Sequence, residues 1–148
     1  MKDRIRVKGH LTAILLSEDN MVKQVVEKDN MIVTSGLEYI ADRLNTNPEY
    51  NAMSHYAIGT STTETTIDNT SLVTEIARVS LDPQFRSGGE ISYVAGFLPG
   101  VGTGSITEAG IFNASSGGSM LARLTFPTII KSATDTLIMI HKITVIAL

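Results

Sequence analysis

The sequence predicts a mainly β protein, an antiparallel β-sandwich of jelly-roll or immunoglobulin-like connection, with one short helix near residues 36–44. Two observations support this prediction. Residues 88–126 contain three short apolar runs separated by turns of Gly, Ser, Pro and Asn, which is the pattern of an antiparallel meander. Residues 5–16 alternate apolar and polar side chains, with the period of two that a half-buried strand requires.

The composition indicates one domain over residues 1–148 that buries an ordinary core. The chain has no cysteine, so neither a disulfide framework nor a thiolate metal site is expected. It carries 12 Lys and Arg against 15 Asp and Glu, a net charge of −3. This balance provides no basic field for phosphates, and we expect no nucleic-acid partner.

The two ends of the sequence indicate a protein that is made and used without export. Residues 1–8 are charged, carry no targeting signal and are expected to form an extended N-terminal arm. The most apolar segment, residues 137–148, is interrupted by His141 and Lys142. It is far shorter than the roughly 20 residues that span a bilayer. We therefore expect no membrane partner.

The first elements predicted along the chain are a hairpin and a helix. After the strand 5–16, a polar turn at 17–20 leads into a return strand at 21–27, and residues 28–30 are expected to turn the chain again. The period then becomes helical. The predicted apolar face of the helix, which Thr34 or Ser35 is expected to cap, consists of Leu37, Ile40, Ala41 and Leu44. A helix this short is expected to cover one end or edge of a sheet.

The middle of the chain alternates loops with short strands. Residues 45–53 are a predicted loop, residues 55–59 a strand, and residues 60–70, TSTTETTIDNT, the longest surface loop. Residues 72–81 fit either a helix or a strand. We favour a strand in their second half because Asp82-Pro83 follows and the surroundings are β-rich.

The last predicted strand, residues 136–148, is apolar on both faces. A strand with one face in water should alternate cleanly, so this strand is either central in a two-sheet sandwich or covered by a neighbouring subunit. We expect residues 138–148 to contribute both to the core and to a contact between subunits.

Glycines at 100, 102 and 104 superficially suggest a phosphate-binding loop. A P-loop requires a Gly-Lys-Ser/Thr end, and a dinucleotide fingerprint requires a helix that opens on the glycines. Here no lysine follows, and residues 106–112 have the pattern of a strand. Residues 100–105 are therefore predicted to form a flexible hairpin turn.

No metal site is predicted. His10, His55 and His141 each stand alone in a predicted strand, without the spacing of metal ligands. The 60–70 loop contains Glu64 and Asp68, whose oxygens suit a cation, but their spacing is not that of an EF-hand and a solvated loop is favoured.

Candidate catalytic groups also lack partners in the sequence. Ser105 and Ser119 lie at boundaries between turn and strand, without a GxSxG elbow or a nearby base. The carboxylates within predicted strands are Glu75, Glu90 and Glu108. Glu108 lies in an apolar strand, where an acid is usually paired, and Arg78 and Arg123 are its candidate partners. We predict no catalytic residue, no cofactor and no enzymatic activity.

Four segments in order resemble small virion structural proteins of tailed bacteriophages: HYAIGTSTTETT (55–66), LVTEIARVSL (72–81), GVGTGSITEAGIFNA (100–114) and DTLIMIHKITV (135–145). The resemblance covers roughly residues 8–148, and ITEAGIFNA at 106–114 is its most specific piece. The sequence departs from the family pattern at Ser61, where a glycine is usual, and by the extra residues 45–53. The resemblance implies a β-rich virion component and brings no active-site motif.

Members of this family are labelled as head-decoration, tail-fibre-like or simply structural proteins. The chain lacks coiled-coil heptads and β-helix repeats, so a compact decoration (cement) protein suits it better than a fibre shaft. We expect such a protein to be made in the host cytoplasm, to reside in the virion and to bind the major capsid protein. It is expected to be a homo-oligomer, most simply a trimer, that holds capsomers together through many modest contacts.

Two other functions remain open. One is a tail or neck component, such as a fibre tip, collar or baseplate accessory, which would attach to the host beside other tail proteins. This function predicts a sugar-facing cluster of the 60–70 loop with Tyr50 and Tyr56. The other is an unrelated enzyme or lectin on a sandwich fold, which no motif supports.

Overall fold

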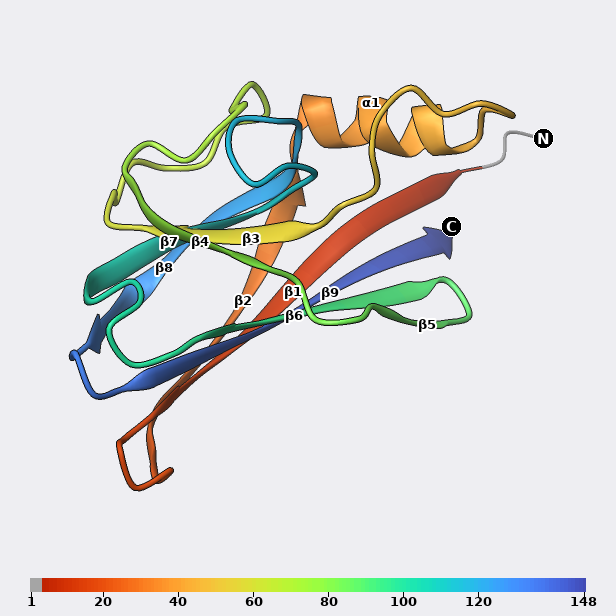
Figure 1. Ribbon diagram of the computed structural model, residues 1–148. Helices are drawn as coiled ribbons and strands as arrows, with labels where there is room; N and C mark the ends of the chain where they lie inside the picture. The colour runs from red at the N-terminus through yellow and green to blue at the C-terminus, as the bar shows by residue number, and fades with distance from the viewer. Residues whose placement is uncertain (1–3) are drawn as a thin grey trace.

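The computed structural model describes residues 4–148, which form one curled, antiparallel sheet and one helix (Figure 1). The elements are β1 (Ile5–Leu16), β2 (Val22–Ile32), α1 (Thr34–Arg43), β3 (His55–Gly59), β4 (Glu75–Ser80), β5 (Phe85–Ser87), β6 (Glu90–Phe97), β7 (Gly104–Phe112), β8 (Met120–Lys131) and β9 (Thr136–Ala147). The order across the nine-stranded sheet is β4-β3-β7-β8-β2-β1-β9-β6-β5. The prediction of a mainly β, antiparallel protein with one helix is confirmed.

The sheet curls into a half-barrel whose two halves face each other. The backbone N–H of Asp82, just after β4, donates to the carbonyl oxygen of Val94 in β6 at 2.8 Å. Because β4 and β6 lie near opposite ends of the strand order, this bond draws the two ends together. The concave side therefore encloses a core between the halves.

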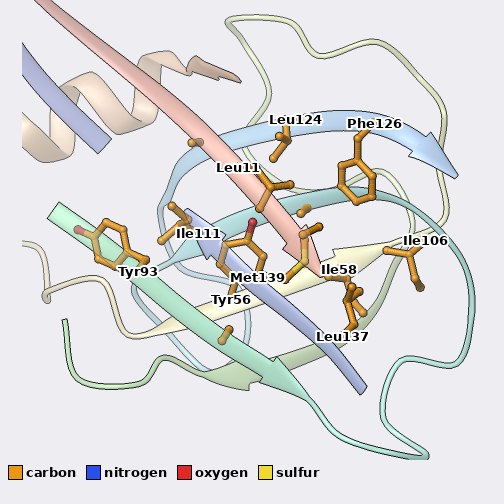
Figure 2. Packing of buried hydrophobic residues seen from close by; sticks show 14 of the residues in the cluster. Leu11, Tyr56, Ile58, Tyr93, Ile106, Ile111, Leu124, Phe126, Leu137 and Met139 are labelled. Atoms are coloured by element: carbon orange, nitrogen blue, oxygen red, sulfur yellow. The ribbon is translucent and has the colours of Figure 1, made fainter. Parts of the chain in front are cut away.

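The core contains apolar side chains from both halves of the sheet (Figure 2). Leu11 and Met139 come from one half and Ile58 and Ile111 from the other, and all are fully buried. The parity predicted for β1 is confirmed, since Leu11, Ala13 and Leu15 alternate with more exposed neighbours. Burial of these side chains stabilises the curl, because a flat sheet would leave them in water.

Strand β2 is longer than the sequence predicted. Residues 28–30, expected to turn the chain, continue the strand, and they pair with Leu11, His10 and Gly9 of β1. The turn prediction is wrong because these polar residues suit an exposed strand as well as a turn. Residues 5–8, expected to belong to an arm, are the first residues of β1 and pair with β9, whereas residues 1–3 lie outside the described part of the chain.

The predicted meander over residues 88–126 is correct only in part. Strands β7 and β8 form a hairpin, but β6 pairs with β5 and β9, not with β7. Residues 98–103 therefore cross from one half of the sheet to the other, and the predicted hairpin at 100–105 is wrong. Gly100 and Gly102 adopt φ of +82° and +71°, which only glycine adopts readily.

The predictions for residues 45–81 are confirmed. Strand β3 has the predicted bounds, residues 45–53 and 60–70 contain no strand or helix beyond isolated turns, and the second half of 72–81 forms β4. Strand β9 lies between β1 and β6, while its predicted central place in a two-sheet sandwich stays a prediction. Its residues Leu137, Met139, His141 and Ile143 face the core.

Helix α1 packs on β8 at one end of the sheet, as a lid, but with a different face from the predicted one. The buried residues are Gly36 and Tyr39, while Leu37 and Leu44 are 45% and 86% exposed. Val33 occupies the N-cap without a side-chain bond, and the Ser35 hydroxyl donates instead to the Met120 carbonyl at 2.7 Å. The missing side chain of Gly36 selects the face, since a Cβ there would collide with the carbonyl oxygen of Leu121.

We expect Gly36→Ala to destabilise the protein by about 1–3 kcal/mol, because overpacking against the Leu121 carbonyl outweighs the gain of about 1 kcal/mol in helix propensity. Gly96→Ala in β6 is the matched control, since a Cβ at Gly96 would meet no atom within 4 Å. Urea unfolding measures both. Equal stability of the two variants would contradict the packing assigned to α1.

Candidate functional site

A buried ion pair lies under the longest loop of the molecule. Glu108 of β7 and Arg123 of β8 are both fully buried, and Nη2 of Arg123 lies 3.1 Å from Oε1 of Glu108. This distance confirms the prediction that Glu108 is paired. Of the two predicted partners, Arg123 is the one that binds it. Arg78 pairs instead with Glu75 at 2.7 Å, and its guanidinium carbon lies 3.8 Å from the centre of the Phe112 ring.

Both members of the pair also bind the loop of residues 60–74. The Glu108 carboxylate accepts hydrogen bonds from the backbone N–H groups of Ser61, Val73 and Thr74, at 3.0, 2.9 and 2.8 Å. These bonds fix both ends of the loop. A carboxylate with three backbone donors and an arginine partner is compensated for its loss of hydration.

Arg123 fixes the middle of the same loop. Its guanidinium donates to the carbonyl oxygen of Thr63 at 2.9 Å, to Oδ1 of Asn69 at 3.1 Å and to Oγ1 of Thr65 at 3.4 Å. The Asn69 side chain also accepts from the N–H of Thr66 at 2.9 Å. The loop is therefore held along its whole length.

Small residues on β3 and β7 allow the loop to lie directly on the sheet. A Cβ at Gly59 would collide with the carbonyl oxygen of Thr74, and a Cβ at Gly110 would stand 3.0 Å from Leu72. Beneath the loop, five buried apolar residues form a second, smaller cluster: Val33, Ala57, Leu72, Phe112 and Met120. The loop thus covers the outer side of this half of the sheet.

The outward side of the loop is rich in hydroxyls, and two apolar side chains, Ile67 and Val73, are exposed among them. Thr62, Glu64, Thr66, Asp68 and Thr70 are exposed. Because the backbone beneath them is fixed, these side chains are presented with little freedom to rearrange. Such a surface suits binding to a partner of fixed shape, because the loop loses little conformational entropy when it binds.

The aromatic residues expected beside this loop do not lie on one surface. Tyr50 is 37% exposed, but Tyr56 is fully buried in the core. The prediction that Tyr56 takes part in a sugar-facing cluster is therefore wrong. Its inward direction follows from the parity of β3, in which Tyr56 and Ile58 face the core.

Tyr56 belongs to a buried chain of hydrogen bonds with His141 and Asn30. The Tyr56 hydroxyl donates to Nδ1 of His141 at 2.9 Å, and Nε2 of His141 donates to Oδ1 of Asn30 at 2.6 Å. Burial lowers the pKa of His141 to about 3 and raises the pKa of Tyr56. The imidazole is therefore neutral, and it links β3, β9 and β2 across the core rather than serving an accessible reaction.

The other two histidines are not bonded to this chain, although the charge of His10 adds to the lowering of the His141 pKa that burial causes. Nδ1 of His10 lies 2.8 Å from a carboxylate oxygen of Asp29, and this bond raises the pKa of His10 above its ordinary value. His10 lines a cleft of about 220 Å³ together with Lys8, Glu90 and Lys142. His55 is bonded to its neighbour Ser54 at 2.7 Å.

The remaining candidate residues do not converge on a reaction centre. Glu75, Glu90 and Glu108 belong to three separate pairs, with Arg78, Lys142 and Arg123. Across residues 4–148, neither Ser105 nor Ser119 has a hydroxyl bonded to a histidine. In the same range, no three His, Cys, Asp or Glu side chains are grouped to hold a metal ion.

We expect Glu108→Gln to cost about 3–5 kcal/mol, because it leaves the buried Arg123 without its counter-charge. The matched control is Glu75→Gln, which breaks a partly exposed pair and is expected to cost at most about 1 kcal/mol. Urea unfolding gives both values. Hydrogen exchange at the Ser61, Val73 and Thr74 amides is expected to accelerate in Glu108→Gln alone. Unchanged protection of these amides would contradict the conclusion that Glu108 holds the loop in place.

The titration of His141 gives a further prediction. Its pKa is lower in the folded chain than in the unfolded chain, so the folded state binds fewer protons and acid favours unfolding. The imidazole is neutral in both states well above pH 6.5, so it has no effect on stability there. As the pH decreases from 6.5 toward about 3, the free energy of unfolding is expected to fall, with a slope that approaches about 1.4 kcal/mol per pH unit about one unit below pH 6.5.

The slope is expected to disappear in His141→Asn and to persist in His10→Gln, because the raised pKa of His10 acts in the opposite direction. Urea unfolding in a pH series provides the test. If the free energy of unfolding falls equally with pH in His141→Asn and in the parent chain, groups other than His141 cause the pH dependence.

Comparison with protein-family models, with curated proteins and with solved structures finds no match in any of the three. Within the described residues, no helix has the length and apolar composition needed to cross a membrane. The geometry of the tethered loop and of the sheet beneath it is therefore the basis for a functional proposal.

Proposed function

We propose that this chain is a bacteriophage virion structural protein, a decoration (cement) protein that binds the outer shell of the capsid and stabilises contacts between capsomers. The observation that supports this proposal is the loop 60–74, a hydroxyl-rich surface whose backbone is bonded to the buried pair Glu108–Arg123. A shell lattice repeats one surface of fixed shape, and a rigid loop binds such a surface without a large loss of conformational entropy.

The proposed partner is the major capsid protein, and the proposed site of action is the virion, after synthesis in the host cytoplasm. Each loop would make a modest contact through its hydroxyls. Several copies held together would add these contacts by multivalency, so that the assembly binds the shell more tightly than one copy does. For this reason we propose a homo-oligomer as the active form, with the trimer as the prediction from sequence.

The finer fold prediction, a sandwich of jelly-roll or immunoglobulin-like connection, is part of this proposal. Its support is that the two halves of the curled sheet face each other across one core and approach at β4 and β6. A curled β domain of this kind presents its loops on a stiff support, which suits a structural role.

Labelling of intact particles tests the location. A gold-tagged antibody to this chain is applied to phage particles from a lysate that contains it, and the particles are viewed by electron microscopy. Gold over the heads is the expected result. Gold confined to the neck or tail tip would support a fibre-tip, collar or baseplate role instead, and unlabelled particles would contradict both.

A substitution in the loop tests the contact itself. Thr62→Arg introduces a bulky charge on the exposed side of the loop, and Ala133→Arg does the same in an exposed turn between β8 and β9. In sedimentation with heads that lack the protein, we expect Thr62→Arg to bind at least about tenfold more weakly than the parent chain, a loss of about 1.4 kcal/mol. Ala133→Arg is expected to bind normally; equal binding of the two variants would exclude the loop from the contact.

A further inference from the structure

The first residues of β1 have a neighbouring strand on one side only. Strand β9 pairs with β1 over its whole length, but the pairing of β2 with β1 ends where Asn30 meets Gly9. The last residues of β2 pair with β8 instead. Figure 1 shows this divergence, since the end of β2 turns toward α1 while the start of β1 stays beside the end of β9. Residues 5–8 therefore form an open strand edge.

The open edge has backbone groups without a partner strand. In an antiparallel ladder, successive residues direct their backbone N–H and C=O groups to opposite sides of the strand. The N–H of Leu148 donates to the carbonyl oxygen of Arg4 at 2.8 Å, so the backbone groups of Arg4 and of every second residue after it face β9. Those of Ile5 and Val7 face the other side, where no strand within residues 4–148 pairs with them. Two donors and two acceptors thus point outward.

A groove of about 490 Å³ lies beside this edge. Its apolar lining includes Ile5 and Val7 from β1, Ile32 from the end of β2 and Leu37 from α1. Ile5 and Leu37 are 72% and 45% exposed, so this part of the groove leaves apolar surface in water. An extended segment with apolar residues on this side would cover both side chains.

The opposite side of the same edge is basic. Side chains alternate along a strand, so Arg4, Arg6 and Lys8 point away from the apolar lining. Asp29 also lines the groove, but its carboxylate is bonded to His10, which lowers the Asp29 pKa more than Lys8 and Arg6 do. Among the described residues, no ion pair includes any of these three cations. An acidic partner would neutralise them.

The same charges exclude a second copy of this edge as the partner. If two copies paired through Ile5 and Val7, basic residues would face basic residues in every antiparallel register. Like charges directly opposite each other destabilise a strand pair, and charged residues on open edges commonly prevent such pairing. A strand that carries acidic residues at alternate positions would meet attraction instead.

We propose that the open edge binds an extended segment of a partner protein, alternating acidic and apolar residues, as an added antiparallel strand. Its apolar residues would bond to the backbone of Ile5 and Val7 and place their side chains in the groove near Leu37. Its acidic residues would lie opposite Arg6 and Lys8. In this kind of recognition, main-chain hydrogen bonds give affinity and alternate side chains give specificity.

The proposal goes beyond the decoration function and does not depend on it. The decoration contact uses the loop 60–74, whereas the added strand uses the start of β1. Shell binding by Thr62→Arg and peptide binding by the pure chain are separate measurements, and either can fail without the other.

An NMR titration of the isotope-labelled chain tests the proposal. The probe is the peptide acetyl-Glu-Val-Glu-Val-Glu-amide, and acetyl-Lys-Val-Lys-Val-Lys-amide is the charge-reversed control. The acidic peptide is expected to bind at least about tenfold more tightly than the basic one. It is expected to shift the amide signals of Ile5 and Val7 and to slow their exchange with water, while the amides of Ser61 and Thr74 in the loop stay unchanged.

Methylation of the peptide nitrogens separates strand pairing from the attraction of charges. Methylation at both valines removes the donors that would bond to the carbonyl oxygens of Ile5 and Val7, and it leaves the charge unchanged. It is expected to weaken binding at least about tenfold. Methylation at the central glutamate is the matched control, because that N–H faces away from β1 in the added strand and binding is expected to persist.

Substitutions in the chain give the reciprocal test. Val7→Pro removes an N–H that the ladder with β9 does not use, so the chain is expected to fold and to bind the acidic peptide at least about tenfold more weakly. Val7→Thr keeps this N–H and is expected to bind like the parent chain. The double variant Arg6→Glu, Lys8→Glu is expected to prefer the basic peptide.

Several results would overturn the proposal. These are no binding of the acidic peptide, equal binding of the two peptides, equal effects of methylation at the valines and at the central glutamate, or a double variant that still prefers the acidic peptide. If Val7→Pro fails to fold, the methylated peptides still test the same hydrogen bonds on the unchanged chain.

Discussion

The ion pair between Glu108 and Arg123 is the constraint on which one half of the molecule depends. Two charges removed from water are costly, and their mutual attraction offsets that cost only when hydrogen bonds satisfy their remaining atoms. Here those bonds come from the loop 60–74. The ion pair orders the loop through these hydrogen bonds, and the same bonds compensate the two buried charges for their loss of hydration. Glycines at 59 and 110 allow the two to meet.

The other half of the molecule depends on the burial of apolar side chains instead of on an ion pair. Strands β2, β1, β9 and β6 bury apolar side chains on their concave side and carry a further apolar row on their convex side. A buried link from Tyr56 through His141 to Asn30 joins this half to β3 across the core. Because this link is neutral and fully bonded, it fixes the relation of the halves at little electrostatic cost.

The two halves therefore present surfaces of different chemistry. One is a polar loop rich in hydroxyls with a fixed backbone, which suits a partner of fixed shape. The other is the convex side of the sheet, where Ile14, Ile138 and Ile140 lie beside the polar Thr12. The fixed polar loop is the feature on which the proposed decoration function rests.

The sequence by itself determined the positions of most strands, because the alternation in β1 and the spacing of turn residues are local signals. It also determined that Glu108 needs a partner, since an acid in an apolar strand has few alternatives. Only the tertiary structure decided which strands pair, so β6 joins β9 rather than β7. It likewise decided that Gly36 selects the buried face of α1, that residues 28–30 remain in β2 and that Tyr56 faces the core. These outcomes depend on contacts between residues far apart in the chain, and the period of a local pattern contains no information about such contacts.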